Sequence, residues 1–167
     1  NCIAAEPVVV FTGVLDYPPN VDAAIHLARD IWPTVRGAVP EARLHLVGRR
    51  PVPAVAALTR DSSVRVLADV PDLAAELRRG WVAAAPMLSG SGVKNKVLEA
   101  WAVGRPVVMT PLASNGLSPS PAQAGLVARS PARQAELIVD LLRDPARRRA
   151  LGDQALQLAR EQYGWRG

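Results

Sequence analysis

The sequence predicts an α/β fold: a Rossmann-like, mostly parallel sheet with helices on both faces. Two observations support this prediction. Short apolar runs recur along the chain, and stretches with helical periodicity separate them. Runs this short and continuous are typical of strands that are buried on both faces. The 167 residues are 49% hydrophobic and 21% charged, so we expect residues 1–167 to form a single domain.

Five apolar runs predict strands, and a sixth run is weaker. The first run is continuous and β-branched, and Gly13 ends it. Because ligands of such sheets bind where the strands end, the loops that follow these runs are the candidate site. The predicted strands are residues 8–12, 43–47, 64–67, 81–85 and 106–110, with the weaker run at 126–128.

End signals and apolar periodicity predict the helices. Asn20 is a candidate N-cap of the first helix, and Pro33 should kink or break that helix. Asp72 can cap the helix after the third strand, and Gly104 closes the helix at 93–103. Further helices are predicted at residues 55–58, 132–142 and 146–162, and residues 114–124 have the composition of a loop.

Charge and composition limit the classes of partner. The net charge of +5 and the sequence pI near 10.3 permit nucleic acid, anionic membranes or phosphate ligands. The one dense arginine run, residues 147–149, falls in a predicted helix, and no stretch interleaves aromatic with basic residues. We therefore expect no nucleic-acid binding.

No apolar run approaches the ~20 residues that span a bilayer, and no signal peptide is visible. The single cysteine, Cys2, cannot form an internal disulfide. We therefore expect a cytoplasmic, reducing setting, and peripheral association with the inner face of the membrane stays open.

The loop after the fourth predicted strand carries the strongest chemical signal. Gly90 and Gly92 precede a helix, whose unpaired N–H groups and dipole suit a phosphate. Lys94 and Lys96 add positive charge, and Glu99 has a carboxylate that could accept two hydrogen bonds from a ribose diol. A simple turn and a surface ion pair are the alternative. The loop matches neither the Walker A pattern nor the Gly-x-Gly-x-x-Gly fingerprint.

Four ordered stretches of the chain resemble the glycosyltransferase group 1 family, retaining enzymes of the GT-B fold. The resemblance spans nearly the whole chain and is strongest for bacterial enzymes that build exopolysaccharide or other surface glycans. It implies that residues 1–167 are the C-terminal, nucleotide-sugar-binding domain of a longer two-domain enzyme. The stretches are residues 90–108, 11–24, 46–73 (its 46–48 and 66–73 parts) and 141–165.

The resemblance also implies roles for individual residues. Glu99 matches the second glutamate of the family's E-x7-E motif, which holds the ribose hydroxyls of the donor. The glycine after the first strand and the glycine loop match backbone that faces the diphosphate and donor sugar. The implied set is Gly13, Gly90, Ser91 and Gly92 for the diphosphate and sugar, Glu99 for the ribose, and Ala68, Asp69 and Val70 near the nucleobase.

The chain departs from the family's pattern at two places. Ser91 stands where the first glutamate of the motif would be, eight residues before Glu99. Many relatives carry an Arg and a Lys after the first strand, whereas residues 14–20 contain neither. We infer that Lys94 or Lys96 supplies the missing charge. The departures leave open an alternative, a non-catalytic nucleotide-binding or interaction module of GT-B ancestry.

We expect the complete enzyme to transfer a sugar, with retention, from a nucleoside-diphosphate sugar to a glycan or lipid-linked acceptor. Helix-end amides and lysines could stabilise the departing diphosphate, so no metal and no cofactor is expected. Catalytic side chains stay unassigned, because most would come from the N-terminal acceptor domain of the full-length protein. A sugar-nucleotide epimerase half would need acidic and histidine residues in the cleft, and a dehydrogenase half would need the missing fingerprint.

Other polar and aromatic residues have plainer interpretations. No Cys/His/Asp cluster has the spacing of metal ligands. His26 and His45 are expected to be structural. Arg105 and Asn115 are expected to border the loops of the site, and a role in capping those loops is an equal alternative. Tryptophan rings should pack in the core or at a domain interface, and they are Trp32, Trp81, Trp101 and, crossing toward the other domain, Trp165.

Overall fold

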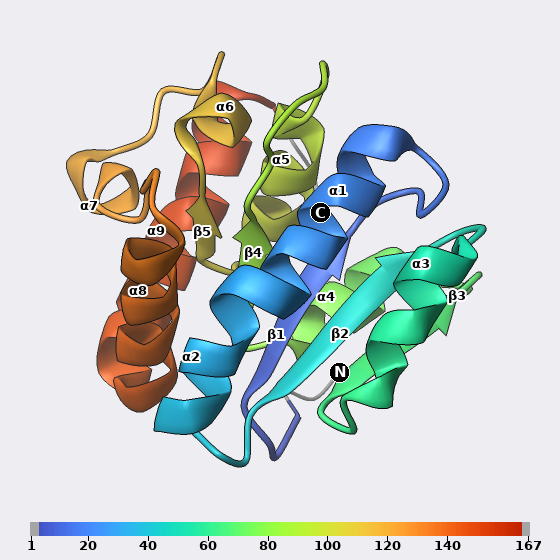
Figure 1. Cartoon of the computed structure of the whole chain (residues 1–167). Helices are drawn as coiled ribbons and strands as arrows, with labels where there is room; N and C mark the ends of the chain where they lie inside the picture. Colours follow the sequence, from blue (N-terminus) through green and yellow to red (C-terminus); the bar gives the residue numbers. More distant parts are fainter. Residues whose placement is uncertain (1–3, 165–167) are drawn as a thin grey trace.

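A five-stranded parallel sheet in the order β3-β2-β1-β4-β5 forms the centre of the protein (Figure 1). The structure is a computed structural model, and it describes residues 4–164 apart from the side chain of Gln162. Cys2 and Trp165 lie outside the described residues. The strands are β1 (Val8–Thr12), β2 (Arg43–Gly48), β3 (Val64–Ala68), β4 (Val82–Ala85) and β5 (Val107–Met109).

The order of the strands fixes where a ligand can enter. From β1 the chain adds β2 and β3 on one side, then crosses to the other side and adds β4 and β5. The switch point therefore lies between β1 and β4. These two strands pair only at Val9–Val82 and Val10–Ala83, so the ladder between them stops before β1 ends. The predicted α/β, Rossmann-like fold is confirmed.

Helices cover both faces of the sheet, as Figure 1 shows. The helical segment of residues 18–38 shares one face with the helix at residues 131–143. On the other face, the helix at residues 94–102 packs against the last helix, residues 145–162. The first face carries α1 (Pro18–His26), the π-helical η1 (Leu27–Ile31), α2 (Trp32–Ala38), α3 (Pro53–Ala56) with the 3-10 segment η2 (Ala57–Arg60), and α8 (Pro131–Arg143). The second carries α4 (Leu73–Arg79), α5 (Lys94–Ala102) and α9 (Pro145–Gln162).

Local signals predicted several helix ends correctly. The Asp72 side chain caps α4 by accepting a hydrogen bond from the Ala75 amide at 3.1 Å. Gly104 follows the end of α5 with φ of +73°, a conformation that glycine adopts without strain. Within residues 4–164, no helix combines the length and apolar character needed to cross a bilayer.

Two predictions about the first helix need correction. Asn20 is not its N-cap, because α1 begins at Pro18 and Asn20 lies buried in the first turn. Its amide instead donates to the Val14 carbonyl at 3.0 Å, which holds the preceding loop against the helix. Pro33 does not break the helix, since the π-helical turn η1 just before it accommodates the proline and the chain stays helical through α2.

The weakly predicted sixth strand after β5 is reduced to a single bridge. Residues 126–128 form an isolated parallel bridge between Val127 and Met109 rather than a strand. Two single-turn helices precede this bridge, and only the second lies within residues 114–124, the stretch predicted as a loop. These are α6 (Pro111–Ser114) and α7 (Pro121–Ala124).

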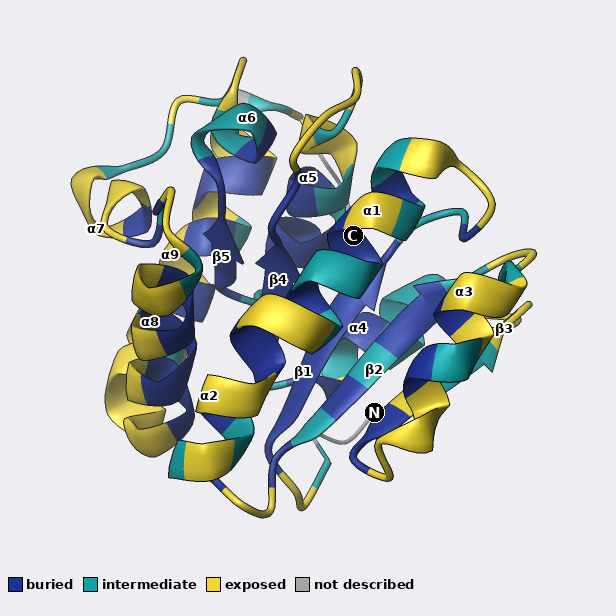
Figure 2. Ribbon diagram, in the orientation of Figure 1, coloured by how far each residue is buried: buried dark blue, intermediate teal, exposed yellow. Residues whose placement is uncertain are grey.

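Burial follows the layered arrangement, with dark strands between helices whose outer sides are exposed (Figure 2). All five residues of β1 and all four of β4 are buried, as expected for central parallel strands. Trp32 and Trp101 are fully buried, in agreement with the prediction of core packing. The Trp32 indole donates to the Ser63 hydroxyl at 2.9 Å, which satisfies its polar atom.

Helix α9 crosses α5 at Gly152, and a Cβ there would overlap the Gly104 carbonyl oxygen. We predict that Gly152→Ala lowers the free energy of unfolding by about 1–3 kcal/mol, the usual cost of overpacking. Gly37→Ala in α2 is the matched control, because a Cβ there meets nothing within 4 Å. That variant should gain about 0.5–1 kcal/mol. Urea unfolding measures both changes, and equal stabilisation by the two would contradict the close approach.

Candidate functional site

Two adjacent hollows open where the strands end, on either side of the start of α5. Their volumes are about 400 and 410 Å³, and Gly92 lines both. Each lies within the size range of small-molecule sites. We call them the inner hollow, lined by Thr12, Gly13, Val14, Val47, Gly48, Arg49, Val70, Leu73, Gly92, Asn95, Lys96 and Glu99, and the outer hollow, lined by Gly90, Ser91, Gly92, Val93, Lys94, Leu112, Asn115 and Gly116.

The floor of the inner hollow depends on two glycines that let β1 and β2 crowd together. A Cβ on Gly48 would overlap the Gly13 carbonyl oxygen, and a Cβ on Gly13 would lie 2.6 Å from Nδ2 of Asn20. The Gly13 amide donates to the Val47 carbonyl at 3.1 Å, which prolongs the ladder past the end of β1. Backbone rather than side chains therefore forms this part of the wall.

Lys96 reaches from α5 to the end of β1. Its ammonium donates to the Thr12 carbonyl and to Oδ1 of Asn20, each at 2.9 Å, and lies 5.2 Å from the centre of the Phe11 ring. The Thr12 carbonyl lies beyond the last paired position of β1 with β4, so the lysine replaces a missing strand partner. Burial lowers the pKa of Lys96 to about 8, against the opposing effect of the Glu99 carboxylate.

Glu99 stands one turn further along α5 and lines the same hollow as Lys96. Its side chain is partly buried, and burial raises the pKa of its carboxyl while the Lys96 charge lowers it. A carboxylate in this position can accept two hydrogen bonds from neighbouring hydroxyl groups. The apolar side chains of Val70 and Leu73 line the hollow as well.

The outer hollow is built around the start of α5. Gly90 has φ of +110° and Gly92 has φ of +66°, so the loop needs residues without a Cβ. The amides of Gly92, Val93 and Lys94 donate to no acceptor among residues 4–164. Unpaired amides and the helix dipole favour an anion here. Lys94 adds charge, and its Nζ would lie 3.5 Å from a Cβ placed on Gly116.

The structure places most of the predicted residues in these two hollows, and their roles remain predictions. Gly13, Lys96 and Glu99 line the inner hollow, and Gly92 lines both. Of the three nucleobase candidates, Val70 lines the inner hollow, whereas Ala68 and Asp69 are exposed at the end of β3 and do not line it. The outer hollow holds Gly90, Ser91 and Lys94.

The sequence predicts no individual role for some residues that line the hollows. Arg49 and Leu73 line the inner hollow, and Leu112 and Gly116 line the outer one. Arg49 directly follows β2, and this position at the end of a predicted strand indicates a residue of the site. Leu112 and Gly116 lie in the loop after the fifth predicted strand, so the same signal indicated them, and their exact place depends on how α6 packs on α5.

Other expectations have mixed outcomes. Asn115 borders the outer hollow as predicted, but Arg105 does not border the site. Arg105 precedes β5 and therefore lies at the amino edge of the parallel sheet. There it donates to the Gly104 and Arg78 carbonyls, at 3.2 and 2.6 Å, which agrees with the alternative of a loop-capping role. His26 contacts Asp30 at 2.7 Å, and burial lowers the pKa of His45. Among residues 4–164, no group of three or more His, Cys, Asp or Glu side chains could hold a metal ion.

Comparison with known proteins adds a family match. The profile of the family described as "Glycosyl transferases group 1" matches residues 6–144, most of the chain. No curated protein matches the sequence.

Several solved structures share the fold. WaaG, a glycosyltransferase involved in lipopolysaccharide biosynthesis, is 19% identical with a TM-score of 0.72, covering 96% of this chain and 44% of WaaG. HepE of Anabaena, in complex with UDP and glucose, is 16% identical with a TM-score of 0.72, covering 93% and 44%. The C-terminal domain of a glycosyl transferase group 1 family protein (LpcC) from Francisella tularensis is 13% identical with a TM-score of 0.71, covering 96% and 87%. The chain spans less than half the length of WaaG and of HepE.

The buried Lys96 predicts a pH dependence of stability. Its pKa is about 8 in the folded protein against an ordinary value of 10.5. Between these values the unfolded chain binds more protons, so the free energy of unfolding should rise with pH, by up to about 1.4 kcal/mol per pH unit. Lys96→Met should remove this rise. Urea unfolding of both proteins from about pH 7 to about pH 10 checks it, and parallel profiles would contradict a desolvated lysine.

Proposed function

Because the chain belongs to the glycosyl transferases group 1 family, we propose that it is the donor-binding domain of a retaining enzyme. In this proposal a nucleoside-diphosphate sugar lies across the carboxyl edge of the sheet. The observation that carries the proposal is the pairing of two hollows that share Gly92, one with a partly buried carboxylate and one with unpaired helix-end amides.

The inner hollow suits the nucleoside. Its apolar surface at Val70 and Leu73 offers a place for a flat base, and the Glu99 carboxylate can accept hydrogen bonds from both hydroxyls of a ribose. Charge supports this arrangement, since Arg49 and Lys96 offset the negative charge of Glu99. HepE, which shares the fold, was solved with UDP and glucose.

The outer hollow suits the diphosphate and the sugar. Amides of Gly92, Val93 and Lys94 face no protein acceptor among residues 4–164, and the positive end of the α5 dipole lies beside them. Lys94 is exposed and can contact a phosphate, whereas the ammonium of Lys96 is already bonded to Thr12 and Asn20. We therefore assign the phosphate contact to Lys94 and a positioning role to Lys96.

Transfer replaces the bond between the anomeric carbon and the diphosphate oxygen with a bond to an acceptor hydroxyl. Negative charge grows on the departing diphosphate as that bond breaks. Fixed amides and Lys94 can stabilise this charge without rearranging, which is how preorganised sites lower a barrier. Retention of configuration, and no need for a metal, are parts of the proposal.

The rest of the proposed enzyme lies outside this chain. We propose that an N-terminal domain of the full-length protein binds a glycan or lipid-linked acceptor and supplies most catalytic side chains. The role of WaaG in lipopolysaccharide biosynthesis supports a bacterial polysaccharide or surface glycan as the product. We place the enzyme in the cytoplasm, where peripheral contact with the membrane would bring it to a lipid-linked acceptor.

Ser91 favours a second candidate, a nucleotide-binding module without transfer activity. Its short hydroxyl lies in the outer hollow at the place where the resemblance implies a glutamate. A restored full-length protein that binds the nucleotide but transfers no sugar would identify this case.

Calorimetric titration with UDP, GDP and ADP tests the inner hollow. We expect one nucleotide to bind the native chain and to bind Glu99→Gln about tenfold more weakly, because a charged acceptor is lost. Glu136→Gln is the control, since it removes an exposed carboxylate on α8. If both variants bind like the native chain, Glu99 does not hold the ribose.

An assay of sugar transfer tests whether the acceptor domain is needed for activity. We predict that the isolated 167-residue chain binds its nucleotide yet transfers no sugar, because the acceptor site lies elsewhere. The assay incubates the chain with a panel of nucleotide-sugars and follows product by mass spectrometry. Turnover by the isolated chain, abolished in Glu99→Gln, would refute the prediction.

A further inference from the structure

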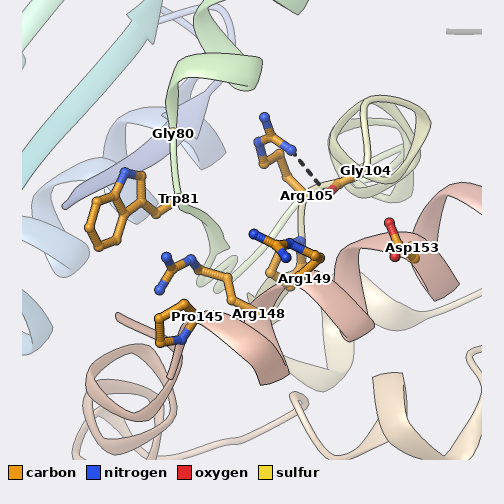
Figure 3. Close-up of a pocket in the computed structure, with 9 residues that line it drawn as sticks. Gly80, Trp81, Gly104, Arg105, Pro145, Arg148, Arg149 and Asp153 are labelled. Atoms are coloured by element: carbon orange, nitrogen blue, oxygen red, sulfur yellow. Dashed lines mark hydrogen bonds between the residues drawn. The ribbon is translucent and has the colours of Figure 1, made fainter. Parts of the chain in front are cut away.

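A third hollow lies at the opposite, amino edge of the sheet, and Figure 3 shows the residues around it. It precedes β4 and β5 on one side and meets the start of α9 on the other. Its volume is about 130 Å³, enough for several water molecules or one phosphate group. Its walls include Trp81, Arg105, Arg148, Arg149 and Asp153.

Three arginines share this hollow, and none of them forms an ion pair within residues 4–164. Arg105, Arg148 and Arg149 have no carboxylate oxygen within 4.0 Å among the described residues. Asp153 lines the hollow but lies outside that distance. The lining therefore carries a net charge of about +2, which matches the charge of a phosphate monoester near neutral pH.

Protein contacts already fix the guanidinium group of Arg148. Nη1 of Arg148 donates to the carbonyls of Leu141 and Leu142, at 2.8 and 3.2 Å, and its group lies 4.2 Å from the centre of the Trp81 ring. These bonds use one nitrogen, and Nε and Nη2 donate to no acceptor within residues 4–164. Because the side chain is held, binding a ligand through the remaining donors would cost little conformational entropy.

The crowded positive charge is unfavourable as it stands. Burial lowers the pKa of Arg105, and the charges of Arg78 and Arg148 lower it further. Burial also lowers the pKa of Arg148, and Arg149 adds to the effect while Asp144 opposes it. Guanidinium groups keep their protons at any ordinary pH, so deprotonation cannot relieve this repulsion. A bound anion can relieve it.

We propose that this hollow binds the phosphate group of a phosphate monoester. Arginine forks match phosphate oxygens in pairs, and the Trp81 ring gives the substituent an apolar surface beside them. The site lies at the far end of the strands from the two hollows proposed for the donor. Both can therefore be filled at once, and the inference stands whether or not the donor proposal holds.

The phosphate could belong to a soluble metabolite or to a lipid headgroup, and the experiment separates these sources. One arm titrates the chain with glycerol 3-phosphate or inorganic phosphate at constant ionic strength. It follows the Trp81 indole N–H by NMR, a group that donates to the Ala4 carbonyl at 2.8 Å. The other arm measures sedimentation with phosphatidylcholine vesicles with and without phosphatidic acid.

The variants that test the site change exposed residues, so we expect them to keep the fold intact. Arg149→Gln should weaken binding about tenfold, because it removes a charged donor from the hollow. Arg147→Gln makes the same charge change in the same helical turn, but Arg147 does not line the hollow, so its effect should be less than about twofold. Asp153→Asn should tighten binding about twofold, since it removes the one carboxylate of the lining.

The outcomes divide clearly. A shift of the Trp81 indole that saturates with a soluble phosphate, and that Arg149→Gln weakens, supports a soluble ligand. Sedimentation that requires phosphatidic acid and falls in Arg149→Gln supports a lipid phosphate. Binding in neither arm overturns the proposal, as does an equal loss in Arg149→Gln and Arg147→Gln, which would indicate general charge attraction.

Discussion

Lys96 carries its ammonium from α5 into the gap at the end of β1, and the candidate donor site is arranged around that contact. The ladder between β1 and β4 stops at Val10–Ala83, which leaves the Thr12 carbonyl without a strand partner. Lys96 supplies the missing donor and also bonds the buried Asn20 of α1. One side chain thus fixes the first turn of α5 against β1 and α1. The helix-end amides and Glu99 take their positions from it.

This arrangement has a cost in desolvation, seen in the low pKa of Lys96 and the raised pKa of Glu99. Glycines make it sterically possible, since Gly48 and Gly13 let β1 and β2 end in close contact. The opposite edge of the sheet is built differently. There Gly152 admits α9 against the end of α5, and arginines that form no ion pair within residues 4–164 gather beside Trp81.

Local patterns predicted the elements whose causes are local. The β-branched run that forms β1, the Asp72 cap and the Gly104 helix end each depend on neighbouring residues, and each is confirmed. The ends of the predicted strands likewise indicated which loops meet at the carboxyl edge. The parallel strand order that brings those loops together follows from the alternation of strands and helices.

Contacts between distant residues set the features that the sequence did not predict. Asn20 matches an N-cap pattern, but its bond to Lys96, 76 residues away, draws it into the first turn of α1. Arg105 precedes β5, and its bond to the Arg78 carbonyl, 27 residues away, fixes where its side chain lies. No local pattern reports whether the ammonium of Lys96 faces a ligand or the backbone of β1.

The central claim is that a nucleoside diphosphate spans the inner and outer hollows with its phosphates on the start of α5. An amide-resolved NMR titration of the chain with UDP tests it most directly. The account predicts that the largest shifts fall on the amides of Gly92, Val93 and Lys94, with smaller ones near Gly13. Saturable shifts that spare the start of α5 and gather elsewhere would contradict it.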